Sequence, residues 1–348
     1  ILFEAFAARV TIAGNMKTAL PDRFANWFAA RDWSAHDHQL EMLVAAQNRE
    51  DTLLIAPTGG GKTLAGFLPS LVEIAETEPA GLHTLYISPL KALAVDIERN
   101  LQSPIEEMGL TITAETRTGD TPQRKRQPQR EKPPHMLLTT PESLALLLSY
   151  ADAPRLFQRL NTVIVDELHA LAGTKRGDLL ALCMARVSTL AKGSRRVGLS
   201  ATVAWPEDLA AWLSPAADAD TVRLIVSEEA VEPKIRILET REELPWSGHM
   251  ATHALPEIYT AIIKHNTTLV FVNTRAQAEV VFQQLWRINN DNLAIALHHG
   301  SLAREQRRKV EAAIARGDLR AVVATSSLDL GVDWASVDLV VQVGAPKG

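Results

Sequence analysis

Short apolar runs alternate with amphipathic helical patterns along the first part of the chain. Within the helical stretches, apolar residues recur three or four positions apart, as Phe24, Trp27 and Phe28 do after Pro21 and Asp22. An alternation of short buried strands with helices is typical of a parallel sheet that helices cover on both faces. The strand-like runs lie at residues 53–55, 84–88, 136–138, 163–165 and 197–199.

A second alternation of the same kind follows an acidic, proline-containing stretch at 206–245. That stretch contains two further strand-like runs, 223–226 and 234–238, and we place a domain boundary between them. The later pattern predicts strands at 268–272, 293–297, 319–324 and 337–343, with helices starting at Ala276 and Ala303. At about 150 residues per domain, the length also suggests two domains. We therefore expect an α/β fold with two parallel-sheet domains, residues 16–230 and 231–348. A leader at 1–15 would precede them, because Met16 offers a translation start.

Composition narrows the class of protein. With 46% hydrophobic and 22% charged residues, the 348-residue chain resembles a soluble globular protein rather than a disordered one. Its first residues are too short an apolar run to span a bilayer, and no membrane partner is expected. The single cysteine, Cys183, excludes an internal disulfide and a cysteine-based zinc site, which fits a reducing cytoplasm. A net charge of −5 does not indicate a dedicated nucleic-acid binder, so local charge must decide that question.

The glycine-rich stretch after the first apolar run predicts a phosphate-binding loop. Residues 53–67 read LLIAPTGGGKTLAGF, which gives a strand, a turn and the start of a helix in that order. Glycine amides and the helix amino terminus attract phosphate, Lys62 would reach the terminal phosphates of a nucleotide, and Thr63 would hold Mg²⁺. An ordinary glycine-rich turn is the alternative, and Ala56 stands where the general pattern has glycine. The expected loop residues are Ala56, Pro57, Thr58, Gly59, Gly60, Gly61, Lys62 and Thr63.

Two adjacent carboxylates follow the β-branched run at 163–165. Asp166 and Glu167 at the end of a buried strand are costly unless a positive group lies opposite them. A magnesium nucleotide would supply that charge: Asp166 would hold the ion, mainly through its waters, and Glu167 would deprotonate the attacking water. The alternative is an acidic strand exit at the surface.

Candidate nucleic-acid contacts lie at other predicted strand ends and in one basic segment. Lys91 follows the strand at 84–88, and we expect Thr139 and Thr140 to expose hydroxyls after the strand at 136–138. The basic segment, 118–134, includes Arg124, Lys125, Arg126, Arg130 and Lys132. A solvated polar loop explains such a segment as well as a contact with a phosphate backbone does. Gln39 could recognise adenine through its amide, although taken alone it is a plain surface residue.

Taken together and in order, these stretches resemble the engine of superfamily 2 helicases. The matching stretches are Gln39, APTGGGKT, PLKAL, TTPESL, DELH and SAT, followed later by LHHGSL and TSSLDLGVD. The residues in several of these stretches resemble those of the large-helicase-related (Lhr-like) branch, which includes DExH helicases associated with DNA ligase. The loop of this superfamily commonly begins with alanine, as at Ala56. The resemblance implies two RecA-like domains in tandem, the second incomplete, that close over ATP.

The resemblance also assigns roles to residues that mean little alone. It places His169, Gly331 and Asp333 beside the nucleotide, and Ser200 and Thr202 in coupling ATP hydrolysis to movement. It places Arg275, Thr325 and Ser326 on the nucleic-acid backbone. Without the family context, a surface ion pair would be the favoured explanation of Arg275.

The implied activity is ATP-driven translocation along one nucleic-acid strand. The Lhr-like resemblance further implies DNA as the track, as a single strand or a duplex with a 3′ tail, 3′-to-5′ polarity, and DNA repair with a ligase or nuclease as partner. Two alternatives stay open: an RNA or RNA–DNA helicase or duplex translocase on the same engine, and a nucleotide-gated binding module without turnover. The intact Glu167 argues against the last of these.

One motif of the family is missing from the sequence. Family members carry a late motif with two arginines, of the form QxxGRxGR, after the strand that corresponds to 337–343. The sequence has no arginine after Arg320. We therefore expect residues 1–348 by themselves to bind Mg²⁺-ATP but to hydrolyse it poorly, as a fragment of a longer helicase would.

Overall fold

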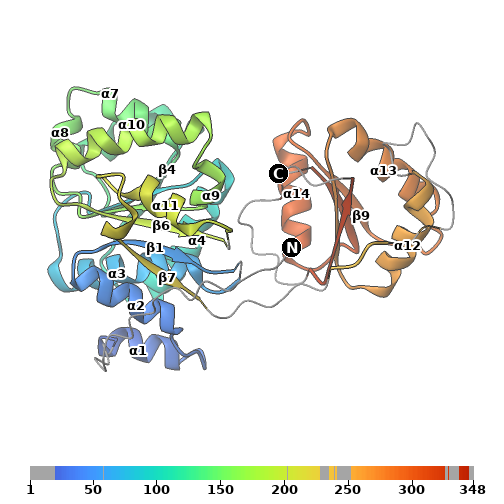
Figure 1. Ribbon diagram of the computed structural model, residues 1–348, viewed down its shortest axis with the longest axis horizontal. Helices are drawn as coiled ribbons and strands as arrows, with labels where there is room; N and C mark the ends of the chain where they lie inside the picture. The colour runs from blue at the N-terminus through green and yellow to red at the C-terminus, as the bar shows by residue number, and fades with distance from the viewer. Residues whose placement is uncertain are drawn as a thin grey trace.

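The structure is a computed structural model that describes residues 20–57, 59–201, 203–227, 235–238, 240, 252–325, 328 and 337–344. Within these ranges, the side chains at 91–93, 95, 96, 99, 252, 304 and 315 are not described. The described chain forms two lobes, each built on its own parallel sheet (Figure 1). None of the described helices combines the length and apolar character that crossing a bilayer requires.

The first lobe is a seven-stranded sheet in the order β3-β4-β2-β5-β6-β1-β7, and its neighbouring strands pair in parallel. The strands are β1 (Asp51–Ile55), β2 (Thr84–Ile87), β3 (Ala114–Arg117), β4 (Met136–Thr139), β5 (Thr162–Val165), β6 (Arg195–Ser200) and β7 (Val222–Val226). Its helices are α1 (Asp22–Ala29), α2 (Asp37–Gln47), α3 (Lys62–Thr77), α4 (Lys91–Glu107), α5 (Gln123–Arg126), α6 (Pro128–Glu131), α7 (Pro141–Ser149), α8 (Ala153–Phe157), α9 (Leu168–Leu171), α10 (Lys175–Leu190) and α11 (Pro206–Leu213).

Helices cover both faces of this sheet, which explains why its strands are continuously apolar. Successive residues of one strand point to opposite faces, so Leu54 joins a core with α1 to α4, whereas Leu53 and Ile55 join a second core with α7 to α11. In Figure 1, α2 and α3 lie below the sheet and α10 lies above it. Because every strand runs in the same direction, the segments that follow β1, β2, β4, β5 and β6 all leave from the carboxyl edge.

The second lobe is a four-stranded parallel sheet in the order β11-β8-β10-β9. Its elements are α12 (Leu255–Lys264), β8 (Thr268–Val272), α13 (Arg275–Arg287), β9 (Ile295–His298), α14 (Arg304–Ala315), β10 (Ala321–Ala324) and β11 (Leu339–Val343). One face packs against α12 and α13, and the other packs beneath Ile314 of α14. The alternation predicted for this part of the chain is confirmed element by element.

Two sequence predictions differ from the structure. Residues 235–238 of the run predicted as a strand at 234–238 form none, and Ile235 and Ile237 are 86% and 93% exposed. The alternating apolar pattern is present there, but no neighbouring strand pairs with these described residues, so the pattern alone was misleading. Conversely, β3 was not predicted, because its sequence AETR carries two charged residues on an edge strand. The proposed domain boundary at 230/231 lies outside the described residues.

Candidate nucleotide site

The phosphate loop lies where the sequence places it, between β1 and the amino terminus of α3. Gly59 and Gly61 have φ angles of 84° and 69°, which side-chain-bearing residues seldom adopt. A Cβ added to Gly61 would also lie 2.8 Å from Nε2 of Gln39, so a larger residue here would have to displace the end of that side chain. Gly60 donates its N–H to the carbonyl of Pro57 at 3.2 Å and closes the turn, while Thr58 lies outside the described residues.

Ala56 shows why the loop tolerates alanine at its first position. Ala56 is 1% exposed, and its N–H donates to the carbonyl of Ser200 at 3.1 Å, which extends the β1–β6 pairing by one residue. It is not among the residues with positive φ, so no glycine is needed there.

A buried ion pair joins the loop to the end of β5. Nζ of Lys62 lies 3.2 Å from Oε1 of Glu167, and each side chain is 7% exposed. Glu167 has a φ of 47°, a left-handed conformation that costs a non-glycine residue roughly 1–2 kcal/mol. This strained backbone lies at the predicted catalytic carboxylate, where fold stability gives no reason for it.

Asp166 is held on both of its carboxylate oxygens. Oδ1 accepts a hydrogen bond from the backbone N–H of Glu167 at 2.9 Å, and Oδ2 accepts one from the hydroxyl of Tyr86. Burial, followed by the neighbouring charge of Glu167, raises the pKa of Asp166 to about 6. Tyr86 was not among the predicted site residues, although a tyrosine in a run expected to be fully buried signals that its hydroxyl has a partner.

His169 connects Glu167 to Ser200. Its Nδ1 lies 3.1 Å from Oγ of Ser200 and accepts the N–H of Ala201 at 3.3 Å, while Nε2 lies 3.4 Å from Oε2 of Glu167. Because Nδ1 accepts a backbone N–H, the proton of the neutral ring belongs on Nε2, facing the carboxylate. Burial lowers the pKa of His169, in keeping with that neutral form. Through His169, the predicted coupling residue Ser200 is therefore linked to Glu167. Thr202, the other predicted coupling residue, lies outside the described residues.

Gln39 is buried and already engaged. It is 2% exposed; its Oε1 accepts the N–H of His36 at 3.0 Å, and its Nε2 donates to the carbonyl of Gly61 at 3.4 Å. In this arrangement the amide ties the start of α2 to the phosphate loop, and recognition of adenine by Gln39 stays a prediction.

The residues assembled here fit a magnesium nucleotide. One buried ammonium faces two adjacent buried carboxylates, which leaves a negative charge that a divalent cation bound with a nucleotide would offset, while the glycine amides and Lys62 face its phosphates. Thr63, in the first turn of α3, and Asp166 supply hard oxygen ligands of the kind that Mg²⁺ uses together with substrate phosphates.

Two of the predicted nucleic-acid contacts of the first domain are buried and already hydrogen-bonded within the protein. Thr140 is 1% exposed rather than open to solvent, because it precedes the first residue of α7 and its hydroxyl donates to Oγ of Ser143 at 3.2 Å. Thr139 is likewise buried and donates to the carbonyl of Arg117 at 2.7 Å. Lys91 begins α4, but its side chain is not described.

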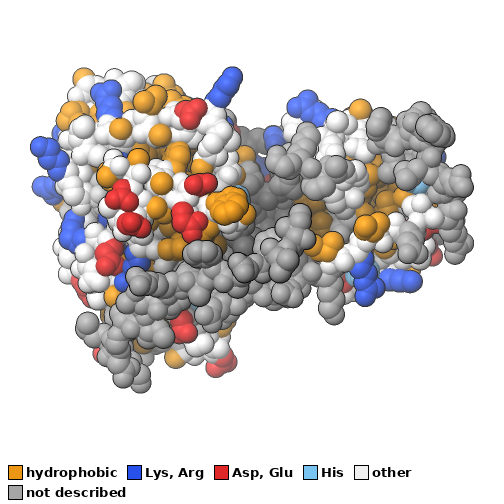
Figure 2. Space-filling model, in the orientation of Figure 1, with side chains coloured by type: hydrophobic (Ala, Val, Ile, Leu, Met, Phe, Trp, Pro, Cys, Tyr) orange, Lys and Arg blue, Asp and Glu red, His pale blue; other side chains and the backbone are white. Residues whose placement is uncertain are grey.

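The basic segment forms the two short helices α5 and α6. Arg124 is exposed on α5. Arg126 instead donates to the carbonyls of Thr121 and Gly119 at 2.8 and 2.9 Å, so its guanidinium holds the preceding loop. On the face seen in Figure 2, the charged side chains at the centre of the first lobe are mainly acidic, among hydrophobic ones, and lysine and arginine lie mostly around its margin. That central face is unsuited to a phosphate backbone.

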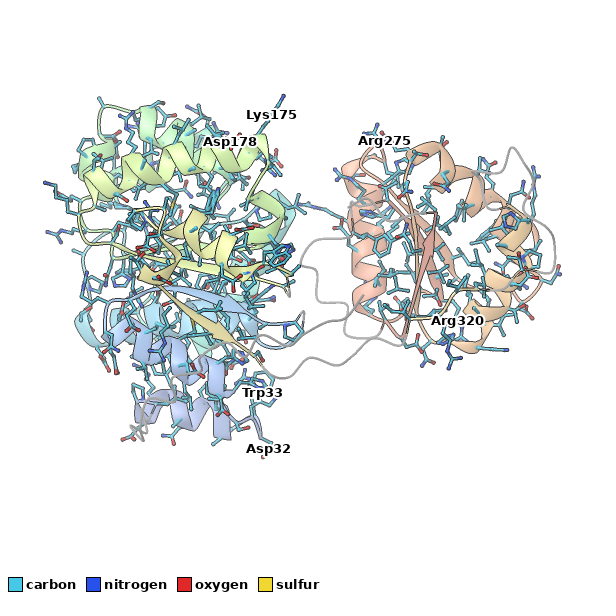
Figure 3. All side chains as sticks on the ribbon, viewed as in Figure 1. Asp32, Trp33, Lys175, Asp178, Arg275 and Arg320 are labelled. Atoms are coloured by element: carbon cyan, nitrogen blue, oxygen red, sulfur yellow. The ribbon has the colours of Figure 1, made fainter. Side chains whose placement is uncertain are left out.

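In the second domain, Arg275 is exposed at the start of α13, on the surface of the lobe (Figure 3). Thr325 directly follows β10, and its N–H donates to the carbonyl of His298 at 3.3 Å. The predicted contacts Ser326, Gly331 and Asp333 lie outside the described residues.

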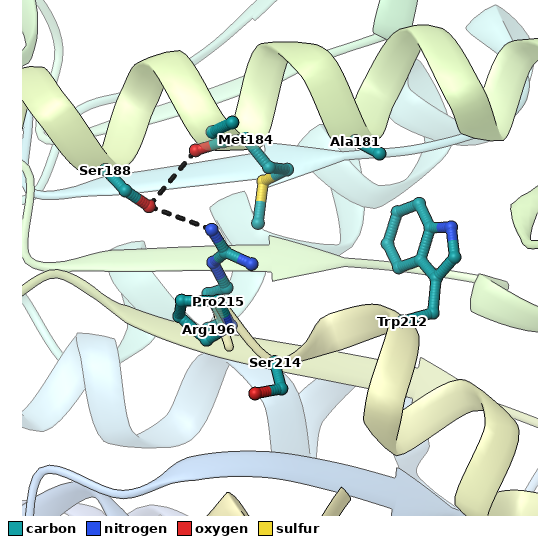
Figure 4. Close-up of a pocket in the computed structure, with 8 residues that line it drawn as sticks. Ala181, Met184, Ser188, Arg196, Trp212, Ser214 and Pro215 are labelled. Carbon is teal, nitrogen blue, oxygen red and sulfur yellow. Dashed lines mark hydrogen bonds between the residues drawn. The ribbon is translucent and has the colours of Figure 1, made fainter. Parts of the chain in front are cut away.

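A separate hollow of about 310 Å³ lies between α10 and α11 (Figure 4). Arg196 forms its polar wall and is already satisfied, since it donates to Oγ of Ser188 and to the carbonyl of Leu213, both at 2.8 Å. The hollow shares no lining residue with the phosphate loop and has no part in the nucleotide site.

Comparison with known proteins shows the family to which the chain belongs. A model of DEAD/DEAH box helicases matches residues 36–209, and a model of the helicase conserved C-terminal domain matches residues 251–348. The chain therefore belongs to the DEAD/DEAH box helicases, as the motifs predicted.

Within that family, the chain is similar to Lhr helicases. It is 37% identical over 366 residues to the ATP-dependent helicase Lhr-Core protein 2 of Thermococcus barophilus, across 98% of this chain and 42% of that protein. It also matches the structure of Mycobacterium smegmatis helicase Lhr bound to ssDNA and AMP-PNP, with a TM-score of 0.74 and 40% identity over 93% of this chain and 43% of that one. The crystal structure of DUF1998 helicase MrfA bound to DNA and AMPPNP has a TM-score of 0.78 and 26% identity over 95% and 47% of the two chains. These neighbours confirm the predicted α/β fold of RecA-like domains, and the chain spans less than half the length of each of these proteins.

Proposed function

We propose that the protein is an ATP-dependent helicase or translocase that moves along one strand of DNA. The observation that carries this proposal is the buried Lys62–Glu167 pair beside Asp166, set between a phosphate loop and the end of a central strand. Such a grouping provides a cation for terminal phosphates and a carboxylate for a water molecule.

Each residue of the site has a distinct proposed task. The amides of Gly59 to Gly61 and the start of α3 bind the phosphates, and Lys62 moves from Glu167 to the terminal phosphates when ATP enters. Glu167 then faces the attacking water as general base. His169, which contacts both Glu167 and Ser200, would transmit a movement of Glu167 to Ser200. Bound Mg²⁺ would be held by Thr63 and Asp166 and would neutralise charge on the phosphates.

The finer assignments rest on the relatives. The M. smegmatis Lhr structure contains ssDNA, and the MrfA structure contains DNA, which supports DNA as the track. We propose a single strand or a duplex with a 3′ tail as substrate, 3′-to-5′ movement, a role in DNA repair with a ligase or nuclease as partner, and a cytoplasmic location. Backbone contacts would come from Lys91, Arg124, Arg275 and Thr325, so sequence selectivity would be low.

The test uses the full-length protein, because residues 1–348 by themselves are expected to hydrolyse ATP poorly. It compares ATP hydrolysis without nucleic acid and with single-stranded DNA, blunt duplex DNA and single-stranded RNA. We expect the largest stimulation with single-stranded DNA, and none in a Lys62→Ala variant. If RNA gave the larger stimulation, the track would be RNA rather than DNA. If blunt duplex DNA gave the larger stimulation, the protein would be a duplex translocase. Hydrolysis that no nucleic acid stimulates would refute the proposal.

Polarity has its own measurement. Duplexes that carry the same single-stranded tail at either the 3′ or the 5′ end are offered to the protein with ATP. Unwinding of the 3′-tailed duplex alone is expected, and unwinding of the 5′-tailed duplex alone would reverse the assignment.

A further inference from the structure

Tyr86 is a buried polar side chain that the proposed mechanism does not yet use. It is 0% exposed in the middle of the sheet, and its ring stacks on Phe67 of α3 with centroids 4.7 Å apart. Its hydroxyl donates to Oδ2 of Asp166. Packing alone does not explain this residue, because phenylalanine would fill the same space without burying a hydroxyl.

The sheet register shows how Tyr86 reaches this position. β2 pairs with β5 in parallel, with Tyr86 beside Ile164, and both residues face the same core. Asp166 follows two residues after Ile164, so its side chain extends toward the same face roughly 7 Å further along the strand. The long, rigid side chain of a tyrosine spans that offset and places a donor at its end.

The two hydrogen bonds to Asp166 fix the plane of its carboxylate. Oδ1 accepts from the backbone N–H of Glu167, and Oδ2 accepts from Tyr86. Each carboxylate oxygen can accept two hydrogen bonds, so each keeps capacity for a metal-bound water. Without the tyrosine hydroxyl, the carboxylate would be held at one oxygen and could rotate about its Cβ–Cγ bond.

We infer that Tyr86 is a positioning residue that holds Asp166 in the orientation needed for the magnesium ion of a bound nucleotide. The inference rests on the proposed function, because it presumes that Asp166 faces magnesium. Hydrogen-bond partners of metal-associated carboxylates typically contribute 10- to 100-fold to metal affinity.

The test uses Tyr86→Phe, which keeps the ring on Phe67 and removes only the hydroxyl. Binding of a fluorescent ADP analogue is measured in magnesium and in EDTA, beside a thermal unfolding curve. We expect the gain in affinity that magnesium gives to fall about tenfold, with the affinity in EDTA unchanged. Tyr150→Phe is the control, because Tyr150 lies beneath the guanidinium of Arg130, whose Cζ is 4.1 Å from the ring centre, whereas Asp166 accepts its hydrogen bonds from Tyr86 and Glu167. The control should match the parent in both conditions.

A double variant separates positioning from a general packing effect. If Tyr86 acts through Asp166, adding Tyr86→Phe to Asp166→Asn should change the magnesium-dependent gain no further. Equal losses in magnesium and in EDTA, or an unchanged gain in Tyr86→Phe, would overturn the inference. If the parent protein itself gained no affinity from magnesium, the proposed function would fail instead, so the two failures are distinguishable.

Discussion

Replacement of Glu167 by glutamine is the most direct probe of the site. Glutamine keeps the size of the side chain but removes the negative charge that faces Lys62 at 3.2 Å and His169 at 3.4 Å. A neutral amide cannot take a proton from water, so the general-base contribution of about 10²- to 10⁴-fold should be lost from the turnover rate. That range corresponds to roughly 2.7–5.5 kcal/mol added to the barrier.

Binding of ATP should respond in the opposite direction. In the ligand-free molecule, Glu167 forms an ion pair with the ammonium of Lys62. Both side chains are 7% exposed, so water screens their attraction little. ATP must therefore compete with Glu167 for the lysine. The Glu167→Gln variant lacks this competitor and should bind ATP at least as tightly as the parent, whereas Lys62→Ala should bind it more weakly.

The assay pairs two measurements on the same preparation. Steady-state ATP hydrolysis at saturating single-stranded DNA gives turnover, and equilibrium titration with a fluorescent ATP analogue gives affinity. Glu76→Gln is a matched control, because Glu76 is exposed on α3 and has no contact with the site. Turnover of Glu167→Gln at the parental rate would show that Glu167 is not the base. Parallel loss of affinity and turnover would show that it holds the loop together instead.

Three further outcomes are expected. Replacing Arg124 and Lys125 with alanine should lower the salt slope of single-stranded DNA binding by about 1.4, at roughly 0.7 for each phosphate contact; an unchanged slope would assign these exposed residues to a solvated loop. Asp166→Asn should raise thermal stability at pH 7, because burial raises the pKa of Asp166 to about 6 and charging it costs the fold up to about 3 kcal/mol. That gain should shrink as the pH falls through 6 toward 4, and its absence at pH 7 would show that burial of the charged carboxylate costs the fold little. Burial lowers the pKa of His83 to about 4, so folding stability should fall between pH 6.5 and 4, by up to about 3 kcal/mol, and urea unfolding of His83→Gln should show a flatter decline over that range.

The sequence predicted the position of the site because its residues follow strands that are unmistakably apolar. Lys62 and the Asp166–Glu167 pair come from different segments. The pair directly follows one buried run, the loop that leads to Lys62 follows another, and a parallel sheet brings such ends to one edge. Strand order was not needed for that conclusion. The family motifs then added roles for His169 and Ser200 that a single residue type could not indicate.

The parts that the sequence did not predict depend on partners far along the chain. Whether the run at 234–238 becomes a strand depends on a neighbour to pair with, and β3 is a strand because β4 pairs with it in spite of its charges. Likewise, no local pattern indicates that the hydroxyl of Thr139 meets the carbonyl of Arg117, or that Tyr86 meets Asp166. Such contacts follow from register between strands, which hydrophobic periodicity leaves undetermined.

The place of β1 in the sheet bears on how the protein folds during synthesis. β1 carries the phosphate loop, yet its two neighbours are β6 and β7, which lie more than 140 residues later in the chain, as in the pairing of Leu53 with Gly198 and Leu224. When β1 has just emerged from the ribosome, neither of its partner strands has yet been synthesised. By contrast, β2 and β4 are much closer together in the chain. Pairings across such distances form slowly, because the chain loses the entropy of closing a long loop before any stabilising contact forms. The apolar strand LLI would stay uncovered until residue 226 emerges, so this segment is where a chaperone should bind the growing chain.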